Sequence, residues 1–296
     1  QLVKVPESAW KSEGSRMYLD PRQPVSVEDL IRDMIVQSGN DATLTLASAI
    51  AGDEAGFVDL MNQAALRLGL RATLYANATG LPHARHRSTA RDLATLAMAL
   101  QRDFPEQYKY YSLKSFTYAG ITQPNRNRLL WADPNVDGLK TGHTDSAGYC
   151  LVASTRRDQR RLVSVLLGAG SDTARASESL KLLNYGLEHY DTIKLYNAAQ
   201  TVTSFRVYKG RGSQLHSGFL SDFHVTLPKG MSAQVKAEVI ARQPLLAPVR
   251  KGQPIATLRL KLGDTPFADY PLVALDDIPV ASLLGRIWDS LMLLFR

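Results

Sequence analysis

Residues 26–50 read SVEDLIRDMIVQSGNDATLTLASAI, and this stretch determines how the first part of the chain folds. Ser26 followed by Asp29 three residues later is a signal for the start of a helix. Apolar residues then recur at the spacing of a helix, as Leu30, Ile31, Met34 and Ile35. The apolar pattern resumes after Ser38-Gly39-Asn40, so we predict two helices with this tripeptide in the short break between them.

Helical patterns continue beyond this stretch and then alternate with strand patterns. Residues 54–68, 88–101 and 175–190 are predicted to be helices, and Ser88 is expected to cap the second of them. From residue 111 onward the pattern changes to short strands separated by turns, as SFTYAG, GYCLVAST and RRLVSVLLGA. The first part of the chain is therefore expected to combine helices and strands.

A second change of pattern occurs near residue 195. Between residues 201 and 275 only short β-type runs remain, separated by Gly, Pro and Asp, which is typical of a small all-β sandwich or barrel. We therefore predict an α+β domain over residues 1–195 and a β-rich domain over residues 196–277.

Composition excludes several classes of protein. Hydrophobic residues make up 45% and charged residues 21%, so the chain is not generally disordered. The single cysteine, Cys150, excludes an internal disulfide framework and a multi-cysteine metal site. The formal net charge of +7 suits an anionic partner, but the basic residues are scattered and match no nucleic-acid motif. We expect no metal, no cofactor and no nucleic-acid partner.

Two short motifs carry the functional prediction. Ser38-Gly39-Asn40 is an S-x-N between two predicted helices, and Lys140-Thr141-Gly142 is a K-T-G at the start of a predicted strand. Alone, each would be read as a helix turn or a strand entry, and Ser38 and Asn40 would be read as helix caps. In this order and context they match two of the three signature motifs of penicillin-binding proteins and class A β-lactamases.

The resemblance extends well beyond these motifs. The stretches LIRDMIVQSGNDA, STARD and LLWADPNVDGLKTGHTDSAGY and the β-rich region resemble the low-molecular-mass D-alanyl-D-alanine carboxypeptidases of the penicillin-binding protein 5 type, over nearly all 296 residues. This similarity implies an antiparallel sheet with helices on both faces. It also implies a periplasmic serine-type enzyme that removes the terminal D-alanine from peptidoglycan pentapeptide stems through an acyl-enzyme and that β-lactams inhibit. A DD-endopeptidase and a non-catalytic peptidoglycan-binding relic are the alternatives.

Acyl transfer from a peptide needs a nucleophile, a base, oxyanion donors and a cation for the terminal carboxylate. By similarity to the family, Lys140 supplies that cation, Thr141 offers a hydroxyl to the carboxylate, and Gly142 lets the substrate approach the strand. Ser38 relays a proton between a neighbouring lysine and the leaving amine. Asn40 offers an amide that donates to and accepts from a peptide bond.

Two further residues are expected at the substrate. The family places an arginine where Arg175 stands, and a guanidinium suits the bidentate binding of a carboxylate. The alternative is a surface arginine at a helix start. His143 is expected to shape the strand edge rather than act as a base, because a lysine-based mechanism needs no histidine.

The third signature motif, S-x-x-K, carries the nucleophile and its activating lysine in this family. Its one literal match is Ser8-Ala9-Trp10-Lys11, in a polar, loop-like segment and about half the usual distance from Ser38. We therefore expect the true motif upstream of Gln1, which would leave the catalytic domain incomplete at its N-terminus.

The chain ends in a distinct apolar element, IPVASLLGRIWDSLMLLFR at residues 278–296. One predicted helical face carries Leu284, Ile287, Trp288, Leu291 and Phe295. Its internal charges make a membrane span improbable, so we predict an interfacial anchor on the outer face of the inner membrane of a Gram-negative bacterium. The alternative is a helix packed onto the protein itself.

Overall fold

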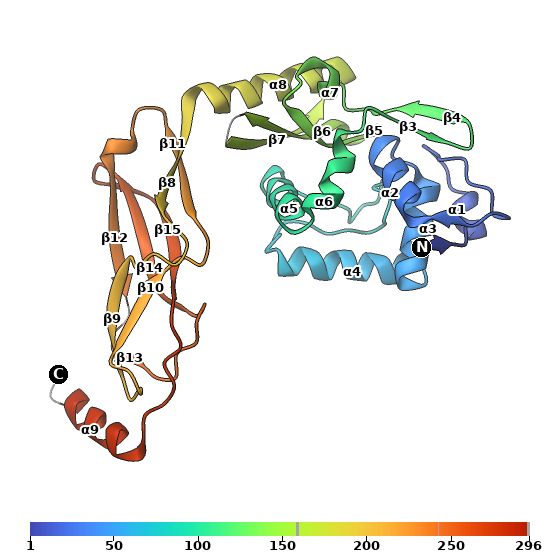
Figure 1. Ribbon diagram of the computed structural model, residues 1–296. Coiled ribbons are helices and arrows are strands. Elements are labelled where there is room, and N and C mark those ends of the chain that lie inside the picture. The colour runs from blue at the N-terminus through green and yellow to red at the C-terminus, as the bar shows by residue number, and fades with distance from the viewer. Residues whose placement is uncertain (158–159, 242, 295–296) are drawn as a thin grey trace. The chain divides into compact units, whose positions relative to one another are not determined.

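The computed structural model describes residues 1–157, 160–241 and 243–294 (Figure 1). Contacts divide the chain into two compact units, Gln1–Leu187 and Glu188–Arg296. The first unit contains helices and strands in mixed order: β1 (Leu2–Val3), α1 (Glu7–Trp10), β2 (Val25–Ser26), α2 (Val27–Val36), α3 (Asn40–Ala51), α4 (Glu54–Arg67), α5 (Ala90–Asp103), α6 (Pro105–Tyr108), η1 (Lys109–Ser112), β3 (Ser115–Tyr118), β4 (Ile121–Pro124), α7 (Leu129–Ala132), β5 (Val136–Thr144), β6 (Gly148–Arg157), β7 (Arg160–Ala169) and α8 (Asp172–His189).

An antiparallel sheet in the order β5-β6-β7 forms the centre of this unit. One core cluster joins its strands to α7 and α8, and another joins them to α5 and α6. Figure 1 shows these helix pairs on opposite sides of the sheet. The expected antiparallel sheet with helices on both faces is confirmed.

A helical region precedes the sheet and carries the predicted break. The hydroxyl of Ser26 accepts a hydrogen bond from the Asp29 amide and caps α2, as predicted. Helix α3 begins at Asn40, so Ser38-Gly39 forms the break between the two helices. The sequence predicts that Ser88 caps the helix over residues 88–101. In the structure the side chain of Thr89 caps α5 instead, because it accepts a hydrogen bond from the backbone N–H of Asp92. The hydroxyl of Ser88 contacts that of Thr73 at 2.8 Å, which explains the shift.

The second unit is β-rich: β8 (Tyr190–Tyr196), β9 (Thr203–Tyr208), β10 (Gln214–Gly218), β11 (Phe223–Pro228), η2 (Ser232–Gln234), β12 (Val235–Ala241), β13 (Leu245–Leu246), β14 (Pro254–Leu262), β15 (Thr265–Ala274) and a terminal helix α9 (Leu283–Leu294). The β8–β11 pair packs against a six-stranded sheet through a core that includes Leu227, Leu258 and Leu272. Strand β8 lies in this unit because it pairs with β11, whereas the sequence pattern placed the boundary at residue 195.

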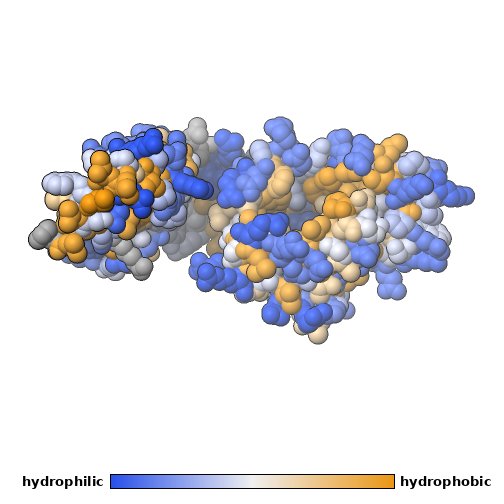
Figure 2. Space-filling view, turned by 90° about the horizontal axis from the view of Figure 1, so that it is seen from below, coloured by the Kyte–Doolittle hydropathy of each residue, from blue (hydrophilic) through white to orange (hydrophobic). Residues whose placement is uncertain are grey.

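Helix α9 is shorter than the predicted element. Residues 278–280 are extended, since Ile278 pairs with Val249 and Val280 with Gly210. The twelve helical residues span about 18 Å, and no helix in the described ranges is long and apolar enough to cross a membrane. Phe295, predicted on the apolar face, lies outside the described residues. Figure 2 shows exposed apolar residues gathered on the surface of this unit.

Candidate active site

The S-G-N and K-T-G motifs meet in space although 102 residues separate Ser38 from Lys140. The ammonium of Lys140 donates to the hydroxyl of Ser38 and, at 2.9 Å, to the carbonyl of Thr141. Ser38 has a positive φ of 63°, a left-handed backbone conformation that residues other than glycine adopt rarely. The side chain does not cap α3: the N-cap is Gly39, and no side-chain bond forms there. The helix-cap interpretation of Ser38 is therefore wrong.

The buried carboxyl group of Asp33 packs against the Ser38-Gly39 break between α2 and α3. A Cβ on Gly39 would lie 2.0 Å from Oδ2 of Asp33, so glycine is required for this close approach. Burial, and next the charge of Asp41, raise the pKa of Asp33 to about 7. Oδ2 of Asp33 has no hydrogen-bond partner among the described residues. Nothing in the sequence marks Asp33, which looks like an ordinary polar residue in a helix pattern.

Asn40 and Asp41 join the N-terminal segment to α3. The amide nitrogen of Asn40 donates to the carbonyl of Glu13 at 2.7 Å, and its backbone N–H donates to Ser15 at the same distance. The fully buried carboxylate of Asp41 accepts three backbone N–H groups from residues 17–19. Asn40 is thus fixed beside Ser38, while its contact with a substrate peptide stays a prediction.

The K-T-G motif lies in the second half of β5 and not at the start of a strand, because β5 begins at Val136. In the described sheet β5 pairs with β6 alone, so its other edge has no strand partner. Thr141 is buried, and a Cβ on Gly142 would meet nothing within 4 Å. The ring of exposed His143 packs against that of Tyr149 with centroids 4.0 Å apart and the ring planes tilted by 35°. Gly142 therefore borders open space along a strand edge.

Positive charge is concentrated at this edge. Burial, then the charges of Arg126 and Arg175, lower the pKa of Lys140 to about 8. Arg126 was not among the residues predicted from the sequence. Its loop is held by the neighbouring buried side chains of Asn125 and Asn127, and its guanidinium donates to Ser15 at 2.7 Å. An arginine between two asparagines carries little signal by itself, and only the folded chain shows its distance from Lys140.

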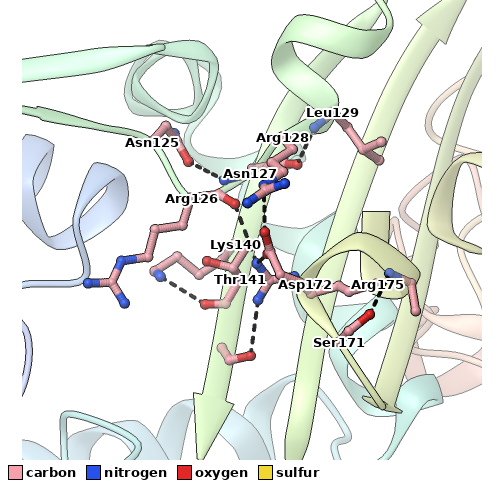
Figure 3. A network of polar contacts seen from close by, with 12 residues as sticks. Asn125, Arg126, Asn127, Arg128, Leu129, Lys140, Thr141, Ser171, Asp172 and Arg175 are labelled. Atoms are coloured by element: carbon pink, nitrogen blue, oxygen red, sulfur yellow. Dashed lines mark hydrogen bonds and ion pairs between the residues drawn. The ribbon is translucent and has the colours of Figure 1, made fainter. Parts of the chain in front are cut away.

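Arg175 lies inside the protein and is not a surface arginine. It is 5% exposed, its guanidinium donates to the carbonyls of Gly142 and Arg126 at 3.5 Å, and it lies over the ring of Tyr149. It also pairs with Asp172 (Figure 3). This position beside the K-T-G strand agrees with the predicted carboxylate-binding role without testing it.

The literal S-x-x-K match has none of these features. Ser8 is exposed on the four-residue helix α1, and the ammonium of Lys11 pairs with Glu7 at 2.6 Å on the surface. Such a lysine is solvated and turned toward a carboxylate, so it cannot activate Ser8 in this arrangement. Among the residues placed by the structure, no group of three His, Cys, Asp or Glu side chains could hold a metal ion.

Comparison with known proteins gives a consistent result for both units. The family model for D-alanyl-D-alanine carboxypeptidase matches residues 1–171, and the model for the penicillin-binding protein 5 C-terminal domain matches residues 190–280. The chain is 42% identical to D-alanyl-D-alanine carboxypeptidase DacA of Haemophilus influenzae, over 99% of this chain and 76% of the relative. It is 40% identical to DacC of Escherichia coli, over 100% and 76%.

A solved structure agrees with these relatives. Penicillin binding protein 5 from Haemophilus influenzae is similar with a TM-score of 0.84 and 41% identity, over 94% of this chain and 83% of that one.

Proposed function

The chain belongs to the D-alanyl-D-alanine carboxypeptidase family, and from this premise we propose that it is a serine-type hydrolase that removes the terminal D-alanine from peptidoglycan pentapeptide stems. The observation that carries the proposal is the contact between Ser38 and Lys140, which joins two distant family motifs at a strand edge that has no strand partner among the described residues. We also propose that β-lactams inhibit this enzyme by acylating it, which is supported by its similarity to a protein named for binding penicillin.

The strand edge explains how a stem peptide binds. An extended peptide can add to β5 through main-chain hydrogen bonds, and the open space beside Gly142 allows its backbone to approach. Lys140, Thr141 and Arg175 then surround the terminal carboxylate, with His143 at the rim. Because a terminal carboxylate is what distinguishes a carboxypeptidase substrate, this cationic end favours release of D-alanine over cleavage inside cross-links.

Ser38 and Lys140 together can deliver a proton to the leaving group. Attack on the scissile carbonyl expels D-alanine as an amine that must gain a proton. The hydroxyl of Ser38 donates that proton, and the ammonium of Lys140, already directed at Ser38, replaces it. A lysine with a pKa lowered to about 8 gives up a proton more readily than a lysine with the ordinary pKa of 10.5.

We infer that the acylated serine is not among residues 1–296. Ser8 is exposed and Lys11 pairs with Glu7, and the contact of Ser38 with Lys140 supports a role for Ser38 as proton relay and not as nucleophile. The test is to treat protein purified from the cells that make it with penicillin and to locate the adduct by peptide mass spectrometry. An adduct on a peptide outside residues 1–296, together with D-alanine release from a pentapeptide, is expected.

Other outcomes are equally informative. An adduct on Ser38 would make the Ser38–Lys140 pair the nucleophilic dyad, and an adduct on Ser8 would contradict our interpretation of α1. Absence of any adduct and of D-alanine release would leave a peptidoglycan-binding protein without catalysis and would contradict the proposed function.

We further propose that α9 attaches the protein to a membrane surface. Its exposed apolar residues include Trp288 at 66% and Leu284 at 80%, and Arg286 is exposed on the same helix. An amphipathic helix of this kind lies in the interface and does not span. The helix is attached through Asp289, whose carboxylate accepts the backbone N–H of Lys209. Together with the enzyme's substrate, this suggests the outer face of the inner membrane, facing the periplasm of a Gram-negative cell.

Deleting residues 283–296 tests the anchor. The deletion begins after Val280 because Ile278 and Val280 pair with other residues of the second unit and must be kept. The truncated protein should no longer co-sediment with vesicles of phosphatidylethanolamine and phosphatidylglycerol but should release D-alanine at the original rate. Loss of activity would show that α9 is packed as part of the fold.

A further inference from the structure

A single carboxylate, that of Asp172, lies between two arginines, one of which is beside the K-T-G strand. Asp172 is the first residue of α8, and one of its oxygens pairs with the guanidinium of Arg175. Its other oxygen pairs with Nε of Arg128 at 2.5 Å. Figure 3 shows the carboxylate between these two side chains, with Lys140 and Thr141 nearby. The contact ties the start of α8 to the loop that precedes α7.

Arg175 needs such a partner because its surroundings are positive. Lys140, Arg126 and Arg175 are close enough to affect one another electrostatically, and Arg175 is almost fully buried. Like charges in a buried site repel strongly. Within the described ranges, Asp172 is the only acid that forms an ion pair with any of these cations. Without it, the guanidinium would be held by two long bonds to carbonyl oxygens and by the face of Tyr149.

We propose that Asp172 is a positioning residue for substrate-carboxylate recognition, which holds the guanidinium of Arg175 beside the K-T-G strand by bridging it to Arg128. This inference rests on the proposed function, because it assumes that Arg175 binds the terminal carboxylate. A guanidinium has five N–H groups, so Asp172 can hold one side of the fork while others face a ligand. The ion pair thus determines the direction of the fork before substrate arrives.

The alternative is that Asp172 only stabilises the first turn of α8, where an acidic residue interacts favourably with the helix dipole. The two roles differ in what they affect. A helix-stabilising residue changes the melting temperature and lowers reaction with every ligand equally. A residue that orients Arg175 changes reaction with anionic ligands and leaves neutral analogues nearly unaffected.

Penicillin and its methyl ester provide that comparison, since they differ in one negative charge at the carboxyl group. We would measure the second-order acylation rate constants of both with the full-length protein, by intact-mass spectrometry, for Asp172→Asn and Asp172→Glu. Asp172→Asn should lower the rate constant for penicillin about tenfold and that for the ester less than twofold, as expected for loss of one charge-assisted contact. Asp172→Glu keeps the charge. Its ratio of the rate constant for penicillin to that for the ester should be at least half of the ratio in the original protein.

A matched control is Glu178→Gln, which removes the same charge from the same helix at an exposed pair with Lys181. It should leave both rate constants and their ratio unchanged. The proposal is overturned if Asp172→Asn leaves the ratio unchanged, or if it accelerates penicillin selectively, which would make Asp172 a competitor of the ligand. If the unaltered protein reacts with neither compound, the proposed function itself has failed.

Discussion

The two units of this chain depart from ordinary burial in opposite directions. The first unit buries polar and charged side chains at its site, including Asp33 at 1% and Arg175 at 5% exposure. The second unit has an ordinary apolar core but exposes apolar side chains on α9, including Leu284 and Trp288. Neither pattern stabilises a fold by itself, since buried charge is costly and exposed apolar surface gains nothing in water.

The comparison shows where each function lies. In the first unit, burial and then the charges of Arg126 and Arg175 lower the pKa of Lys140, and this group of cations provides a place for an anion. In the second unit, α9 can bury its apolar face only against another surface, and a lipid interface would provide it. If the division is sound, changes at one place should leave the other unaffected.

The largest expected effect comes from Lys140→Ala, which removes the cation that contacts Ser38. Acylation by penicillin should slow about 100-fold or more, because a charge-assisted contact to the carboxylate and a proton donor are both lost. Binding to vesicles should not change. Lys181→Ala, at an exposed lysine on α8, is the control and should react normally. Acylation of Lys140→Ala at the original rate would refute the K-T-G assignment.

The next effect concerns stability and should arise in the first unit alone. The pKa of Asp33 is raised to about 7 in the folded protein from 3.8, so the folded state resists ionisation. Its protonation stabilises the fold fully below pH 3.8, and this stability is lost as pH rises from about 4 to 7. Asp33→Asn stays neutral, so its stability relative to the original protein should rise by about 4 kcal/mol over that interval.

Denaturant unfolding at pH 4 and pH 8 measures this difference. Asp103→Asn is the control, because Arg102 lowers the pKa of that exposed carboxyl and no gain with pH is expected. A stability difference that is the same at both pH values would show that folding does not raise the pKa of Asp33.

A smaller effect is expected from Trp288→Ala on α9. Removing one exposed aromatic ring should weaken partitioning to vesicles about tenfold, from the apolar area that it would bury in the interface. Trp131→Ala is a matched control, since Trp131 is 50% exposed but lies in the first unit. Equal losses from both substitutions would mean that the membrane-binding surface is not specific to α9.

The smallest effect is a displacement of a pH profile. The ammonium of Lys140 is lost as pH rises, so kcat/KM for D-alanine release should fall above pH 8, where this pKa lies. Arg126→Gln removes one of the charges that lower this pKa. The pKa of Lys140 should therefore rise, and the alkaline limb of the pH profile, where kcat/KM falls, should move to higher pH. A limb that stays in place would show that a different group controls it.

The sequence predicted much of the local structure because local rules govern it. Helix periodicity and the Ser26 cap located α2, the break and α3, and the strand runs located β6 and β7. It misplaced the cap of α5, since Ser88 and Thr89 are both good caps and the contact between Ser88 and Thr73 decides between them. The first residues of the terminal element were assigned to a helix because nothing local shows that they pair with distant strands.

By itself, the sequence determined the family, the two motifs and the amphipathic end of the chain, because residue type, order and period carry that information. Only the tertiary structure placed Lys140 against Ser38 and brought to it Arg126 from a loop and Arg175 from α8, where Arg175 pairs with Asp172. It also showed that Asp33 lies beneath Gly39. Electrostatic interactions depend on distance through space and on burial, and neither quantity can be read from positions along a chain.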